Sequence, residues 1–191
     1  MNLDKLRKQM NKVQDDDRFE HTLGVAYTAA NLAAIYGEDV EDAIVAGMLH
    51  DCAKCIPDEK KIDLCKKYGL ELSHGECKNP SLVHARLGAE LAYDKYDVDN
   101  ERILDAIRYH TMGRPAMTLL EQLIFVADYM EPGRRKAPNL LEIRRLAYQN
   151  IDKATVKILE DTLSHLEEDG EEIDYCTVDT LQFYRTKLIY K

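Results

Sequence analysis

The chain is 191 residues long, a length typical of one compact domain, and 45 % of its residues are apolar, which is enough to build a core. No uninterrupted apolar run approaches the ~20 residues that a membrane span requires, and the polar N-terminal segment lacks the apolar centre of a signal peptide, so we expect a cytoplasmic protein with no membrane partner. The formal net charge of −9 argues against a broad basic surface for DNA or RNA, so a small anionic ligand would need a bound metal or a few arginines.

Helical periodicity extends over nearly the whole sequence and alternating β-branched runs are scarce, so we predict an all-α fold without a sheet. Segments that begin at Asp17 and Thr118 have the form of capping boxes. Asn79 before Pro80 predicts a cap followed by proline at the first helical position. The expected helices cover 3–14, 17–36, 39–50, 58–68, 80–96, 99–110 and 118–130, with two or three more over 139–190, broken at Gly170. The expected loops are 71–79, 111–117 and 131–138.

The five cysteines are an odd number, which in a cytoplasmic protein indicates reduced thiols and not a disulfide framework. Cys52 and Cys55 form a C-x-x-C pair. A structural zinc site would need a second such pair, and a thioredoxin-like motif would need a neighbouring strand pattern. The sequence has neither, so we assign the pair no role.

Histidines and aspartates occupy unusual places in the expected helices. His50 and Asp51 close the apolar segment AIVAGMLHD. Asp128 lies inside the apolar segment LIFVADYM, where a carboxylate is costly to bury unless a cation or several donors meet it. His21 lies among apolar residues, and His84 and His110 lie near the start and the end of their helices. None of these positions is typical of a solvated charge.

Each of these residues also has an ordinary structural alternative. A single histidine of this kind is more often hydrogen-bonded or partly exposed than metal-bound, Asp128 alone fits a cap or an arginine pair, and an HD dipeptide arises by chance. The joint pattern indicates a metal site with mixed histidine and aspartate ligands. His74, in a polar loop, and His165, in a charged helix, do not belong to it.

Five segments together resemble the YqeK family of HD-superfamily phosphohydrolases, and the resemblance covers roughly residues 2–188. HDxAK, YHTxGRP and ADYxEPxR, in this order and spacing, are much more specific than HD alone. The segments are RFEHTLGV (18–25), AGMLHDCAK (46–54), LVHARLGAELA (82–92), ILDAIRYHTMGRP (103–115) and LIFVADYMEPGRR (123–135). The resemblance implies a single all-α HD-domain bundle over 1–191, with a metal-site core at about 17–135 and C-terminal helices at 139–190. It also implies a symmetrical bis(5′-nucleosyl)-tetraphosphatase, which hydrolyses diadenosine tetraphosphate to two ADP with bound iron.

The same resemblance implies a set of metal ligands at matching positions of this chain. The set is His21, His50, Asp51 and Asp128 for a first metal, and His84, His110 and a bridging Asp51 for a second. Imidazole and carboxylate donors suit iron, manganese or zinc, and the lack of thiolates weakens a structural zinc site. We therefore expect a dinuclear iron centre, with manganese or another divalent metal as the alternatives.

Asp51 and Lys54 are the expected catalytic residues. Asp51 would orient the attacking water, and Lys54 would neutralise a phosphate oxygen if its ammonium reaches the same side. The expected substrate-binding residues are Lys54, His84, His110, Thr111, Arg134 and Arg135, with Arg134 preferred to Arg135. The loop that contains Gly113 and Arg114 is expected to close over the phosphates. Arg18 and Arg86 are secondary candidates for phosphate contact, and we expect them instead to form surface ion pairs.

Three other interpretations remain open at this point. The chain can be an HD phosphohydrolase acting on dNTPs, nucleoside monophosphates or a signalling nucleotide, a nucleotide- or metal-binding module without turnover, or a helical scaffold without a ligand. The sequence also leaves a monomer and a homodimer open. We expect the Leu3/Leu6/Met10 stripe to pack on the core and not to form a dimer seam.

Overall fold

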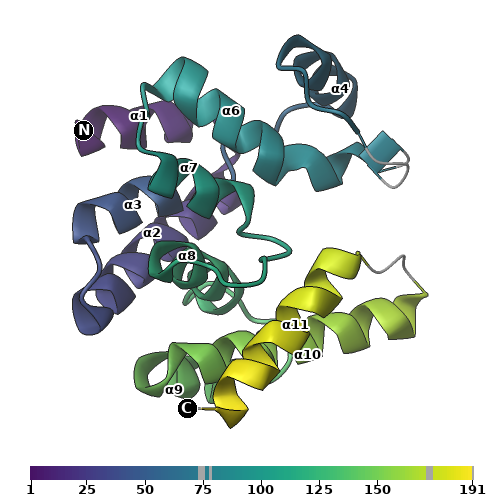
Figure 1. Cartoon of the computed structure of the whole chain (residues 1–191). Coiled ribbons are helices and arrows are strands. Elements are labelled where there is room, and N and C mark those ends of the chain that lie inside the picture. The colour runs from purple at the N-terminus through teal and green to yellow at the C-terminus, as the bar shows by residue number, and fades with distance from the viewer. Residues whose placement is uncertain (73–75, 78, 171–173, 191) are drawn as a thin grey trace.

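The computed structural model describes residues 1–72, 76–77, 79–170 and 174–190, and every regular element in these ranges is helical (Figure 1). The elements are α1 (Leu3–Val13), α2 (Asp16–Tyr36), α3 (Val40–Leu49), α4 (Asp58–Lys67), η1 (Pro80–Val83), α6 (His84–Tyr96), α7 (Glu101–Arg108), α8 (Leu119–Met130), α9 (Leu140–Gln149), α10 (Ile151–Asp169) and α11 (Tyr175–Ile189). The prediction of an all-α fold is confirmed. His74 and part of the expected loop 71–79 lie outside the described residues.

The helix starts follow the capping signals, although not always at the expected residue. Thr118 caps α8 through a full capping box with Glu121, as predicted. The predicted start at Asp17 is wrong, because the carboxylate of Asp15 accepts the N–H of Arg18 and begins α2 two residues earlier. Three consecutive aspartates occupy this start, and the first of them is the cap.

The expected helix 80–96 is divided into two parts. Asn79 caps it as predicted, but the first turn, Pro80–Val83, is a 3₁₀ helix, and α-helical geometry begins at His84. The tighter turn is stabilised by the N–H of Leu82, which donates to the Asn79 carbonyl at 3.1 Å. This division places His84 at the first position of α6.

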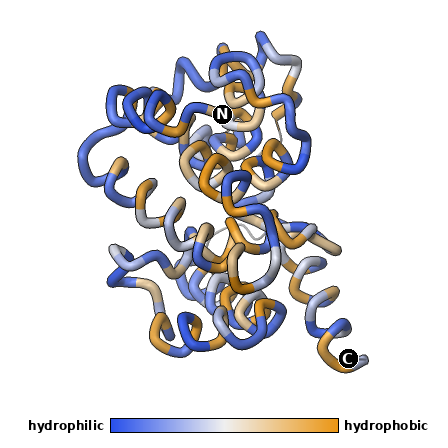
Figure 2. The backbone as a smooth tube through the Cα atoms, turned by 90° about the vertical axis from the view of Figure 1, so that its left-hand side faces the viewer, coloured by the Kyte–Doolittle hydropathy of each residue, from blue (hydrophilic) through white to orange (hydrophobic). Residues whose placement is uncertain are grey.

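The helices form two groups, which Figure 1 shows one above the other. In the upper group α2 packs on α3 and α8, and α7 contacts α3, α6 and α8. In the lower group α10 contacts α9 and α11, and it joins the two groups through its contact with α8. Figure 2 shows hydrophobic segments in the middle of the molecule and hydrophilic segments along its outer turns. The elements of the upper group carry the candidate site.

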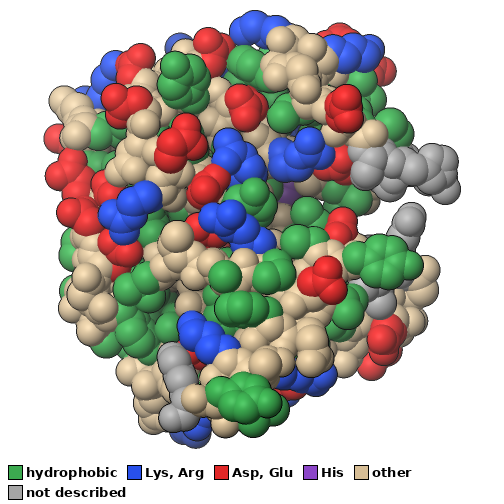
Figure 3. Space-filling model, viewed as in Figure 1, with side chains coloured by type: hydrophobic (Ala, Val, Ile, Leu, Met, Phe, Trp, Pro, Cys, Tyr) green, Lys and Arg blue, Asp and Glu red, His purple; other side chains and the backbone are tan. Residues whose placement is uncertain are grey.

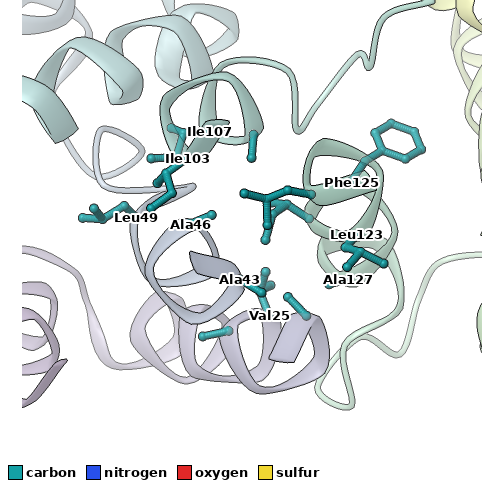
Figure 4. Packing of buried hydrophobic residues seen from close by; sticks show 14 of the residues in the cluster. Val25, Ala43, Ala46, Leu49, Ile103, Ile107, Leu123, Phe125 and Ala127 are labelled. Atoms are coloured by element: carbon teal, nitrogen blue, oxygen red, sulfur yellow. The ribbon is translucent and has the colours of Figure 1, made fainter. Parts of the chain in front are cut away.

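Small side chains let α2 and α3 approach closely. A Cβ on Gly47 of α3 would lie only 2.6 Å from the Cα of Ala26 on α2, so glycine is required at this crossing. His50 follows Gly47 by one helical turn, and the crossing therefore brings it to the half of α2 that contains His21. Figure 4 shows the apolar side chains that fill the core around this crossing. The labelled ones are Val25, Ala43, Ala46, Leu49, Ile103, Ile107, Leu123, Phe125 and Ala127.

Leu6 and Met10 of the N-terminal stripe are buried in the same core, which confirms that the stripe packs internally. The cysteines are free thiols, as expected, and burial raises the pKa of Cys52 to about 12. Among the described helices, none is both long and apolar enough to cross a membrane.

Candidate metal centre

Six side chains, here called the His/Asp cluster, converge between α2, α3, α6, α7 and α8. They are His21 on α2, His50 and Asp51 at the end of α3, His84 at the start of α6, His110 just after α7, and Asp128 on α8. All six were proposed from the sequence as metal ligands, and the fold brings them together from positions far apart in the chain. Figure 3 shows histidine at the bottom of a hollow that is bordered by basic side chains.

Asp51 lies at the centre of the cluster and faces a different pair of histidines on each side. Its Oδ2 is 3.4 Å from Nε2 of His50 and 3.9 Å from Nε2 of His21. Its Oδ1 is 3.2 Å from Nε2 of His84 and 3.7 Å from Nε2 of His110. Each histidine pair forms with Asp51 a group whose possible ligand atoms lie within 4.8 Å of one another.

Asp128 adjoins the group that contains His21 and His50. Its Oδ1 lies 3.0 Å from Nε2 of His21 and 3.8 Å from Nε2 of His50. The Nε2 atoms of these two histidines are 3.3 Å apart. The first group can therefore offer two imidazoles and two carboxylates to one cation.

Backbone carbonyls fix the orientation of three of the four imidazole rings. Nδ1 donates to the carbonyl three residues earlier in His50 (Gly47, 2.7 Å), His84 (Ser81, 2.6 Å) and His110 (Ile107, 2.7 Å). A carbonyl oxygen only accepts hydrogen bonds, so the ring proton must be on Nδ1. In the neutral ring Nε2 then carries the lone pair, and in all three cases Nε2 faces the cluster. Metal-binding histidines in proteins are held in the same way, through the other ring nitrogen.

The buried side of the cluster contains an acceptor without a donor. Oδ1 of Asp51 is buried and accepts no hydrogen bond from any residue that the structure describes. A buried carboxylate oxygen without a donor is costly unless a cation meets it. Together with the inward Nε2 atoms, this oxygen gives a donor set that fits a divalent metal.

The electrostatics of both carboxylates and of His84 favour the forms that bind a cation, whereas Asp51 outweighs burial and raises the pKa of His50. Burial opposes ionisation of Asp51, but the neighbouring His50 ring outweighs it and holds the pKa of this carboxyl well below its usual value. Burial also opposes ionisation of Asp128, but its contacts with His21 and His50 hold its pKa well below the usual value. Burial lowers the pKa of His84 to about 3. Near neutral pH both carboxylates are therefore ionised, and His84 is neutral.

Two arginines face the cluster from its partly exposed side. Nη1 of Arg18 lies 2.7 Å from Oδ2 of Asp51. Nη2 of Arg134 lies 2.9 Å from Oδ1 of Asp128, and its Nε donates to the Asp128 carbonyl at 3.1 Å. The expectation that Arg18 forms a surface pair is wrong, because its partner is a buried member of the cluster; only the tertiary fold brings the two together.

Lys54 lies beside the cluster on a turn and not on a continued helix. Its N–H donates to the Asp51 carbonyl at 2.9 Å, and this turn directs its Nζ to within 3.4 Å of Nδ1 of His84. Burial lowers the pKa of the ammonium group. This position agrees with the expectation that the Lys54 ammonium group reaches the same side of the site as Asp51.

Arg114 has a structural role in place of the expected one over the phosphates. Its Nε and Nη2 donate to the two oxygens of the buried Glu121 carboxylate at 2.6 and 2.8 Å, and its guanidinium lies 4.5 Å from the centre of the Tyr109 ring. These contacts fasten the loop 111–117 to the start of α8. The sequence could not show them, because the acceptor belongs to the next helix.

The other expected residues are distributed around the site. Arg86 pairs with Glu76, with both N–O distances at 3.0 Å, as an ion-pair partner would. Thr111 is partly buried beside His110, and Arg135 is exposed. Their expected substrate contacts remain predictions. His165 is exposed on α10 and pairs with Asp169, in agreement with its exclusion from the metal site.

Glu131 is a buried residue at the site that the sequence analysis did not single out. Its Oε1 lies 3.2 Å from Nδ1 of His21, and its side chain is 4 % exposed. The available signal was its place in the ADYxEPxR motif, directly after the apolar helix that carries Asp128.

Comparison with known proteins agrees with this geometry. The profile of the HD domain matches residues 18–133. The chain is 42 % identical over 151 residues, 79 % of its length, to the symmetrical bis(5′-nucleosyl)-tetraphosphatase of Bacillus subtilis, of which it covers 80 %. It is 35 % identical to the protein of the same description from Staphylococcus aureus, over 96 % of this chain and 95 % of that one.

A solved structure gives the same result for the fold. It is from Clostridium acetobutylicum and is described as a predicted HD superfamily hydrolase involved in NAD metabolism. It superimposes with a TM-score of 0.93, at 36 % identity and with 98 % of each chain covered. From its profile match, its relatives and its His/Asp cluster, this chain belongs to the HD-domain family and is closely related to the symmetrical bis(5′-nucleosyl)-tetraphosphatases.

Proposed function

We propose that this protein is a metal-dependent hydrolase that cleaves diadenosine tetraphosphate symmetrically to two ADP. One observation carries the proposal: Asp51 is shared by two groups of potential ligands in a chain that is 42 % identical to a symmetrical bis(5′-nucleosyl)-tetraphosphatase. Mixed imidazole and carboxylate donors are typical of metal sites that act on phosphate esters and anhydrides.

Two sets of residues would hold the metals. His21, His50, Asp51 and Asp128 would hold the first, and Asp51, His84 and His110 the second. Iron is the metal that the family resemblance favours, and manganese or another divalent metal is the alternative. When bound, such a metal supplies Lewis acidity, which neutralises phosphate charge and lowers the pKa of water from ~15.7 towards ~7.

The chain's own cations would position the substrate. Arg18 and Arg134 border the cluster with guanidinium groups that can bind phosphate through two parallel hydrogen bonds. Lys54, partly buried beside His84, would neutralise a non-bridging oxygen of the phosphate that is attacked. Thr111 and Arg135 would contact the phosphate chain or a nucleoside farther from the cluster.

The reaction adds one water across the central bridge of the tetraphosphate. The water oxygen forms a bond to one of the two central phosphorus atoms, and the bond from that phosphorus to the bridging oxygen breaks. One ADP leaves as an anion, and the other carries the added oxygen. Binding of the phosphate chain with its midpoint at Asp51 would therefore determine that the products are identical.

Product analysis tests this function directly. The purified protein is incubated anaerobically with diadenosine tetraphosphate and Fe²⁺, and in parallel with Mn²⁺, and nucleotides are separated by ion-exchange chromatography. Two ADP per substrate is the expected result, whereas ATP with AMP would overturn symmetrical cleavage. Turnover of a dNTP or a nucleoside monophosphate alone would favour another HD phosphohydrolase, and binding without turnover would favour a sensing module.

Elemental analysis of protein purified without oxygen identifies the metal. Light scattering on the same sample separates a monomer from a homodimer.

A further inference from the structure

The four histidines of the His/Asp cluster differ in the group that accepts a hydrogen bond from Nδ1. His50, His84 and His110 lie at helix ends or junctions, where backbone carbonyls have no partner within the helix. His21 lies inside α2, where the carbonyls three and four residues earlier already accept the helical N–H groups. It therefore needs an acceptor from another part of the chain.

That acceptor is the carboxylate of Glu131, which three separate features hold in place. Its Oε1 is 3.2 Å from Nδ1 of His21, and its Oε2 accepts the backbone N–H of Gly133. Arg144 on α9 donates to the Glu131 carbonyl at 2.8 Å and so fixes the turn that follows α8. Gly24, one turn after His21 on α2, leaves room for the carboxylate, because a Cβ there would lie 2.5 Å from Oε2.

We propose that Glu131 is a positioning residue that keeps the ring proton of His21 on Nδ1 and so directs the Nε2 lone pair into the His/Asp cluster for metal binding. The inference rests on the proposed metal-dependent function. A carboxylate acceptor makes an imidazole a stronger ligand than a carbonyl acceptor does, and loss of such a partner typically weakens metal binding about 10- to 100-fold. We expect weaker binding only of the metal that His21 would hold, and not of the metal between Asp51, His84 and His110.

Glu131→Gln tests the proposal, because glutamine has one acceptor oxygen for two N–H groups, those of His21 Nδ1 and the Gly133 backbone. If its amide N–H₂ faces His21, it donates to Nδ1 and moves the ring proton to Nε2, as an amide does when it replaces the aspartate beside a catalytic histidine. Titration of the metal-free protein with Mn²⁺ by calorimetry should then show about 10- to 100-fold weaker binding in one of two steps. Two-bond ¹H–¹⁵N spectra of the metal-free protein should show a proton on Nδ1 of His21 in the wild type and none on Nδ1 in the variant. Nδ1 is the readout because Nε2 faces Oδ1 of Asp128 at 3.0 Å.

Glu121→Gln is the matched control. Glu121 is as buried as Glu131 and lies at the opposite end of α8, where its partners are Arg114 and Thr118. This variant should lower the melting temperature and leave both Mn²⁺ affinity and the His21 tautomer unchanged. A Glu131→Gln protein that behaves in the same way would overturn the proposal and leave Glu131 a structural residue.

Two further results keep the test decisive. If Glu131→Gln is unfolded by circular dichroism, Glu131→Asp, which keeps two acceptor oxygens, should retain the Nδ1 proton of His21, and loss of that proton would overturn the proposal. If the wild type binds no metal, the proposed function fails, and the tautomer spectra still decide whether Glu131 orients His21.

Discussion

Asp51→Ala should remove most of the metal-dependent stabilisation, because Asp51 is the one side chain common to both ligand groups. Free metal at 100 times its dissociation constant stabilises the folded wild type by about 2.7 kcal/mol. For a chain of this length each kcal/mol raises the melting temperature by about 2–4 °C, so the expected shift is about 5–11 °C. Loss of a ligand should weaken binding by at least the ~100-fold that loss of a ligand's hydrogen-bond partner can cause. At the same metal concentration about 0.4 kcal/mol would remain, a shift of about 1–2 °C.

The assay is thermal unfolding with and without Mn²⁺, performed on each protein separately. The comparison within one variant is necessary because Asp51→Ala also removes the ion pair with Arg18 and changes the metal-free baseline. The helical circular dichroism spectrum should persist, and hydrolysis of diadenosine tetraphosphate should be lost. A variant that keeps the full thermal shift and full hydrolysis would refute the assignment of Asp51 as a shared ligand.

Arg134→Ala should raise KM about tenfold or more, since hydrogen bonds to charged groups contribute about 1.5–3 kcal/mol, while metal content stays nearly constant. An unchanged KM would remove Arg134 from the substrate-binding residues, and a loss of metal would reassign it to the positioning of Asp128. Gly47→Ala should destabilise the fold by about 1–3 kcal/mol, or about 2–12 °C of melting temperature, because the new methyl group meets the backbone of Ala26; an unchanged melting temperature would contradict this close approach. Burial opposes ionisation of Glu121, but its arginine partner outweighs it and lowers the pKa, so this carboxylate stabilises the fold above the ordinary glutamate pKa and less so as the pH falls. Unfolding across the acid range should therefore show a steeper loss of stability in the wild type than in Glu121→Gln, and equal slopes would contradict the assignment.

The helices and the residues of the His/Asp cluster could be predicted because short sequence patterns indicate both. Thr118 and its capping box gave the start of α8 directly. The start of α2 was predicted two residues too late, because any of three successive aspartates could serve as the cap and the helix uses Asp15. His50, Asp51 and Asp128 were recognisable because polar groups inside apolar segments need a buried partner.

The contacts between segments were not predictable in the same way. Arg18 was expected in a surface ion pair and Arg114 in a loop over the phosphates. Their partners, Asp51 and Glu121, lie 33 and 7 residues away. The local sequence does not predict which carboxylate a guanidinium group will bind once the helices have packed. The same applies to Glu131, whose partner is 110 residues earlier in the chain.

The hydrogen bonds from ring nitrogens to carbonyls link the orientation of the imidazoles to the last turns of their own helices. His50 and His110 hold the carbonyls of Gly47 and Ile107, and terminal turns are the parts of helices that open first in native-state fluctuations. Each opening would rotate a ring away from Asp51, and an ion held by Nε2 would oppose that rotation. Amide hydrogen exchange at the C-terminal ends of α3 and α7 would therefore slow in proportion to ion occupancy, so these two helix ends would report on ligation without any added probe.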